Sequence, residues 1–149
     1  MDGWTIDAKS YEDERRYDLP ETATDGNPEA ASDGYLLLRP LTDAESLQRE
    51  SLGIEEWYYL DGQEPTVRRT YNLQQMAEYD YRHCIVDFSL PVRRGDEVEM
   101  VAMPDDPDAM IELLRLMPPR LAEWVAECIA DVNMRSLQQR RTMAGAKKN

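Results

Sequence analysis

The chain has 149 residues, of which 42% are apolar, and its 30 acidic and 17 basic side chains give a net charge of −13. This length and apolar content suit one domain with a hydrophobic core. No run approaches the roughly 18 apolar residues of a transmembrane helix, and the N-terminus lacks the basic and apolar segments of a secretory signal, so we expect neither. One histidine and two cysteines leave few ligands for zinc.

The charge is divided unevenly between three segments. Residues 1–34 carry a net charge of −7, residues 134–149 carry +5 with no acidic side chain, and the middle of the chain carries −11. An acidic domain repels the phosphates of nucleic acids, so we expect protein partners and neither a nucleic acid nor a membrane as partner. We divide the chain into an acidic arm (1–34), a helix-rich domain (35–134) and a basic C-terminal tail (135–149).

The acidic arm is predicted to be flexible and disordered. Residues 21–34 are rich in Asp, Gly, Pro, Ser and Ala and contain little that could be buried to offset the entropy of ordering. Trp4, Tyr11 and Tyr17 could still dock onto this domain or onto a partner. A flexible tether is the simpler interpretation for a terminal segment.

Order is predicted to begin at Tyr35 with an extended segment followed by a short helix. The apolar run 35–38 suits a strand packed on the core. Thr42 and Glu45 have the spacing of a capping box, in which each side chain bonds to the backbone N–H of the other residue. The helix should therefore start there and end near Leu52, with Gly53 as a left-handed cap.

Residues 55–71 are predicted to form a hairpin or an extended loop, with a turn at Asp61-Gly62. Trp57, Tyr58 and Tyr59 are consecutive, and successive side chains of a strand point to opposite faces. At least one of these rings should therefore face outward, where aromatic side chains favour interfaces. The alternative is that two of them cap the neighbouring helices and one is partly exposed.

A long helix is predicted over residues 72–90, with Asn72 as its N-cap and Pro91 ending it. Apolar or small side chains recur three or four residues apart, which is typical of one buried helix face. They are Leu73, Met76, Ala77, Tyr81, Cys84, Ile85 and Phe88.

The C-terminal third is predicted to contain a hairpin and two helices. A small hairpin is expected over residues 91–103, a short helix over 106–117 with an Asp-Pro start, and a second helix over 119–134. Beyond Leu137 we expect a fraying extension. The fold class is thus mostly α, a small α+β domain with one or two hairpins.

Only a few residues suggest chemistry. His83 and Cys84 are adjacent on the predicted helix and point about 100° apart, so they cannot act together on one substrate or ion. Cys84 is better explained as a core thiol, and a disulfide with Cys128 is the less favoured alternative. The acidic segment 105–108 lacks the pattern of a calcium loop, and no glycine-rich phosphate loop is present. We therefore predict no enzyme and no catalytic, metal or cofactor site.

Three segments carry a family resemblance. They are Leu38-Arg39-Pro40-Leu41-Thr42-Asp43-Ala44-Glu45 entering a helix, the stretch 79–87, and Leu116-Met117-Pro118-Pro119 leading into another helix. With them, residues 35–133 resemble phage tail assembly chaperones of long-tailed phages. The resemblance implies a small, mostly helical domain that binds the tape measure protein and recruits tail tube subunits during tail assembly in the host cytoplasm. It implies no catalytic residue.

Partner binding is predicted at three aromatic and three basic side chains, namely Trp57, Tyr58, Tyr59, Arg135, Arg140 and Arg141. Self-association is a further expectation. The eight methionines could add an adaptable apolar surface, although methionine fills gaps in cores more often. Two other functions stay open: a structural virion protein of the tail or connector, and an acidic inhibitor that mimics nucleic acid.

Overall fold

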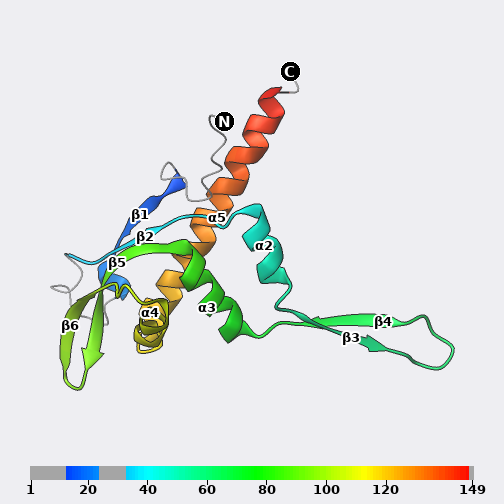
Figure 1. Ribbon diagram of the computed structural model, residues 1–149, viewed down its shortest axis with the longest axis horizontal. Helices are drawn as coiled ribbons and strands as arrows, with labels where there is room; N and C mark the ends of the chain where they lie inside the picture. The colour runs from blue at the N-terminus through cyan, green and yellow to red at the C-terminus, as the bar shows by residue number, and fades with distance from the viewer. Residues whose placement is uncertain (1–12, 24–32, 148–149) are drawn as a thin grey trace, which may run out of the picture.

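The computed structural model describes residues 13–23 and 33–147 (Figure 1). The elements in chain order are β1 (Arg15–Asp18), η2 (Glu21–Ala23), β2 (Tyr35–Leu38), α2 (Asp43–Glu50), β3 (Ile54–Tyr58), β4 (Thr66–Thr70), α3 (Leu73–Cys84), β5 (Ile85–Arg94), β6 (Glu97–Ala102), α4 (Pro107–Leu114) and α5 (Pro119–Lys147). Helices make up 47% of the structure and strands 26%. The fold is therefore mixed α+β, and the prediction of a mostly α fold is wrong.

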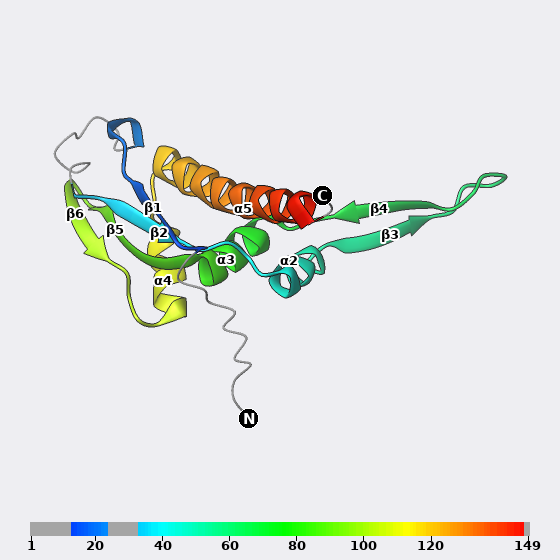
Figure 2. The ribbon, with the colours of Figure 1, turned by 90° about the horizontal axis from the view of Figure 1, so that it is seen from above.

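A four-stranded sheet and the helices around it enclose the core. Its strand order is β1-β2-β5-β6, and each neighbouring pair is antiparallel. Leu36 and Leu38 of β2 are fully buried, whereas Tyr35 and Leu37, which alternate with them, are only half-buried, as expected where one sheet face meets the core. The helices α3, α4 and α5 supply most of the other core residues, together with Leu19, Ala23 and Leu41, and α5 runs alongside the sheet (Figure 2).

The predicted helix over residues 72–90 is correct only in its first two thirds. Asn72 caps α3 as expected, since its side chain accepts the N–H groups of Gln74 and Gln75. The helix ends at Cys84, however, and the next ten residues form β5. The segment after Cys84 is rich in β-branched and aromatic residues and has strands to pair with on both sides, so tertiary pairing overrides the helical spacing.

The prediction that order begins at Tyr35 is also wrong. Residues 15–18 form β1, which pairs with β2, and the Tyr17 hydroxyl donates a 2.7 Å hydrogen bond to Asp131 of α5. Leu19 is buried, and a Cβ on Gly34 would lie only 2.6 Å from its Cδ2 atom. The part of the acidic arm that the structure describes therefore belongs to the domain. The aromatic rings of Trp4 and Tyr11 lie outside the described residues.

Most of the predicted caps and turns are confirmed. The Thr42–Glu45 capping box starts α2, and Asp106 caps α4 with a proline in its first turn. Both hairpins form, each with a glycine at positive φ in its turn. Gly53 is not the left-handed cap that we predicted. Its lack of a side chain is needed because a Cβ there would lie 2.5 Å from the ring of Tyr71.

The last helix is longer than predicted. α5 continues from Pro119 to Lys147, so the segment expected to fray after Leu137 is helical, and most of the predicted basic tail is part of the same helix. None of the described helices combines the length and the apolar character that a membrane span requires.

Candidate protein-binding site

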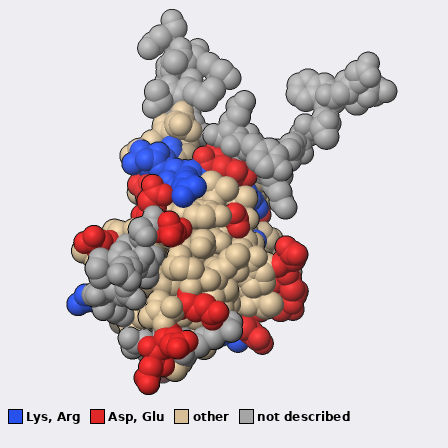
Figure 3. All heavy atoms as spheres, turned by 90° about the vertical axis from the view of Figure 1, so that its left-hand side faces the viewer, with Lys and Arg blue, Asp and Glu red and all other residues tan. Residues whose placement is uncertain are grey.

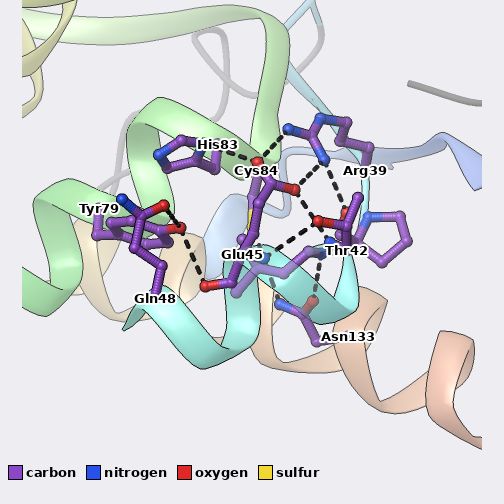
Figure 4. A network of polar contacts seen from close by, with 10 residues as sticks. Arg39, Thr42, Glu45, Gln48, Tyr79, His83, Cys84 and Asn133 are labelled. Atoms are coloured by element: carbon purple, nitrogen blue, oxygen red, sulfur yellow. Dashed lines mark hydrogen bonds and ion pairs between the residues drawn. The ribbon is translucent and has the colours of Figure 1, made fainter. Parts of the chain in front are cut away.

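A network of polar side chains fixes α2 against its neighbours (Figure 4). Arg39, which is 8% exposed, donates two hydrogen bonds of 2.8 and 2.9 Å to the carboxylate of Glu45 on α2. The same carboxylate lies 2.7 Å from Nδ1 of His83 on α3. The hydrogen-bonded guanidinium lowers the pKa of Glu45 to about 2. The carboxylate is therefore ionised at neutral pH and offsets the buried positive charge.

Two further side chains, those of Asn133 and Tyr79, extend this network to the backbone. Asn133 of α5 accepts the N–H of Leu41 at 2.8 Å and donates to the carbonyl of Ile129 at 2.9 Å. The Tyr79 hydroxyl of α3 donates to the carbonyl of Glu45 at 3.0 Å. Side chains from α3 and α5 thus hold α2 at a defined distance from both helices.

The network contains residue types that serve in cysteine hydrolases, namely Cys84, His83 and Asn133. Catalysis by cysteine requires a thiolate, and burial raises the pKa of the Cys84 thiol to about 12. The His83 ring packs on Tyr79, with ring centroids 4.2 Å apart, and bonds to Glu45. These residues therefore act as a structural clamp and do not form an activated nucleophile.

Both cysteines should be unreactive in the native protein. Cys84 and Cys128 are free and buried, and burial raises the pKa of each thiol to about 12. Labelling by a disulfide reagent at pH 8 should be about 100-fold slower than in denaturant, since thiolate and access are both required. A Gln63→Cys variant, whose added thiol lies in the exposed β3–β4 loop, is the matched control. Native labelling of the wild type as fast as labelling of this control would contradict the assignment.

The clamped helices line a groove with a volume of about 760 Å³. The groove is lined by Leu41, Asp43, Ser46, Arg49 and Glu50 before and on α2, by Ala77, Asp80 and Tyr81 on α3, and by Ala126, Ile129, Ala130, Asn133, Met134 and Leu137 on α5. Small side chains from all three helices, such as Ser46, Ala77 and Ala130, leave this space unfilled. The groove therefore follows from small residues on helices that the polar network keeps apart.

The α5 wall of the groove is apolar and exposed. Ala126, Ala130, Met134 and Leu137 recur at helical spacing, and Met134 and Leu137 are 56% and 42% exposed. We call these four residues the α5 stripe. Opposite the stripe, Arg49 of α2 and Asp80 of α3 form two hydrogen bonds of 2.7 and 3.0 Å with each other. Because these two side chains at the rim of the groove pair with each other, the apolar α5 stripe is the main binding feature of the groove.

The predicted aromatic residues lie on a second surface. Trp57, Tyr58 and Tyr59 are 55%, 43% and 76% exposed, so none of them caps a helix. Leu60 and Val67 are also exposed, and we call these five residues, which are spread over both faces of the hairpin, the hairpin patch. The β3–β4 hairpin that carries the patch extends away from the rest of the molecule (Figures 1 and 2).

The predicted basic residues lie on the C-terminal half of α5. Arg135 bonds to Asp131 one turn earlier at 2.8 Å, Arg141 is exposed, and the side chain of Arg140 lies outside the described set. The structure does not bring these residues together with the hairpin patch (Figure 1).

The groove was not predicted from the sequence. Its only sequence signal was that apolar spacing on α5 continues past Met134 to Leu137.

A third face of the molecule is uncharged in its middle and charged at its border (Figure 3). Viewed from the side of β6, uncharged residues form the middle of the face and acidic residues border it, while basic residues gather near one edge (Figure 3). Within residues 13–23 and 33–147, no three His, Cys, Asp or Glu side chains are placed to hold a metal ion.

Comparisons with protein-family models, with curated proteins and with solved structures gave no match to this chain.

Proposed function

We propose that this chain is a protein-binding assembly factor that holds an amphipathic helix of a partner protein in the groove between α2, α3 and α5. The observation that carries the proposal is the exposed α5 stripe beside small side chains on the facing helices. Small residues let a partner helix approach closely, and the apolar stripe offers it a surface to bury. This is the helix-in-groove mode of recognition.

The size of the groove supports a helical partner. Residues 126–137 of α5 span roughly 16 Å at 1.5 Å per residue, which matches about three turns of a partner helix. Such a helix would present apolar side chains at positions i, i+4 and i+7. The net charge of −13 would help to keep a complex with an otherwise insoluble apolar partner in solution.

The resemblance to phage tail assembly chaperones suggests which partners the chain binds. We propose that the chain acts as a tail assembly chaperone, that the partner helix belongs to the tape measure protein, and that tail tube subunits are recruited in the host cytoplasm. On this proposal the chain makes and breaks no covalent bond. The structural alternative, a tail or connector protein, differs in one observable: the chain would remain in purified particles at a fixed stoichiometry.

Filling the groove should abolish the chaperone effect. In Ala130→Trp the indole occupies space in the groove, and we expect the affinity for the tape measure protein to fall about tenfold, equivalent to about 1.4 kcal/mol. The soluble yield of co-expressed tape measure protein should fall with it. Ala130 is exposed, so folding should be preserved, which thermal unfolding will check. Gln139→Trp, on the opposite side of α5, is the matched control. Equal solubility with Ala130→Trp and wild type would overturn the proposal.

A further inference from the structure

The β3–β4 hairpin carries an exposed apolar pair and opposite charges on its two strands. Its register places Trp57 directly opposite Val67, and Glu56 directly opposite Arg68. Adjacent residues of a strand point to opposite faces, so the apolar pair and this charged pair lie on different faces of the hairpin. Glu55 pairs with Arg69 in the register and, two residues before Trp57, belongs to the same face as the apolar pair. The tyrosine at position 58 follows the same alternation, because its hydroxyl donates a 2.7 Å hydrogen bond to Glu56 on its own face.

The β3–β4 hairpin is not part of the four-stranded sheet. It forms a sheet of two strands, and its residues 55–58 and 66–68 are exposed, including Trp57 at 55% and Val67 at 45%. An isolated two-stranded hairpin is marginally stable in water, and its free edges can each accept another strand. The projection of the hairpin from the body leaves both edges accessible (Figures 1 and 2).

We propose that the hairpin is a self-association arm, in which β4 of one copy pairs edge to edge with β3 of a second copy. The pairing is antiparallel and repeats the register of the hairpin itself. It places Trp57 of the second copy opposite Val67 of the first, so that the apolar pair of the hairpin is repeated across the interface. In the same register Glu56 of the second copy lies opposite Arg68 of the first.

The charges of the strands favour this pairing over a symmetric one. β3 carries Glu55 and Glu56 with no basic residue, and β4 carries Arg68 and Arg69 with no acidic residue. A two-fold symmetric contact would pair β3 with β3 or β4 with β4 and bring together two strands of the same charge, which is destabilising wherever like charges lie opposite one another. Pairing of β4 with β3 places opposite charges together. Such a head-to-tail contact uses two different edges, so it builds rings or open filaments instead of closed dimers.

Charge reversal of each strand gives a test that does not depend on the groove. Glu55→Arg/Glu56→Arg makes both strands basic, and Arg68→Glu/Arg69→Glu makes both acidic. Sedimentation of the full chain over a concentration series should show oligomers larger than dimers for the wild type. Each variant alone should associate at least about tenfold more weakly, because like charges then face each other at the edge. An equimolar mixture of the two variants should associate again.

Two further variants keep the test independent of hairpin stability. A variant that combines all four substitutions makes β3 basic and β4 acidic. Opposite charges then face each other within and between hairpins, so this variant should associate like the wild type. Glu123→Arg/Glu127→Arg makes the same charge change on exposed positions of α5 and should leave association unchanged. A wild type that is monomeric at every concentration, a mixture that stays monomeric, or equal loss in the α5 control would overturn the proposal.

Discussion

Replacement of Glu45 by glutamine is expected to lower the free energy of unfolding by about 3–5 kcal/mol. The substitution removes the carboxylate that receives two hydrogen bonds from Arg39, whose side chain is only 10% exposed. The guanidinium cannot lose its proton, so it stays buried without its counter-charge. Urea unfolding at pH 7, followed by circular dichroism, measures the loss.

Two control variants separate this effect from a general weakening of α2. Glu50→Gln, at an exposed position of the same helix, should change the stability by less than about 0.5 kcal/mol. Adding Arg39→Met to Glu45→Gln should recover part of the loss, because no unpaired buried charge then remains. A Glu45→Gln variant as stable as Glu50→Gln would show that the pair does not stabilise the fold.

The pH dependence of stability has a defined sign at this site. The folded protein lowers the pKa of Glu45 from 4.5 to about 2, chiefly through the hydrogen bonds from Arg39. The folded state therefore binds fewer protons than the unfolded state between these values, so the contribution is complete above about pH 4.5 and is lost toward pH 2. Glu45→Gln should have a shallower decline over this window than the wild type.

The sequence predicted the local structure better than the long-range pairing. The side chains of Thr42, Asn72 and Asp106 accept backbone N–H groups at most three residues further along the chain. These caps could therefore be identified without knowledge of the fold. β1 is a short polar segment that is ordered by pairing with β2 and by the bond of Tyr17 to α5. Contacts between residues so far apart in the chain leave no periodic signal, and for this reason β1 was predicted to be flexible.

The two candidate surfaces also differ in how far the sequence alone could predict them. Exposure of at least one ring among Trp57, Tyr58 and Tyr59 followed from the alternation of side chains along a strand, and the structure exposes all three. The groove depends on the relative placement of three helices, which is set by contacts such as those of Glu45 with Arg39 and His83. A single sequence gives the faces of helices but not the distances between them.

Truncation of Phe88 to alanine is the second large effect that we expect, at about 3–5 kcal/mol. Phe88 is 1% exposed and lies on β5 opposite Leu36, and its carbonyl accepts the N–H of Met103 at 3.1 Å. Alanine would leave a cavity at the centre of the sheet, and it is also a weaker strand former than phenylalanine.

The same substitution distinguishes the observed strand from the helix that we predicted for residues 85–90. Within a helix, alanine would return part of the lost stability through its high helix propensity, whereas in a central strand it adds to the loss. Val98→Ala, at a position of β6 that is 39% exposed, is the control and should cost about 1 kcal/mol or less. Equal effects of the two substitutions in urea unfolding would contradict the placement of Phe88 in the core, and with it the pairing of β5 between β2 and β6.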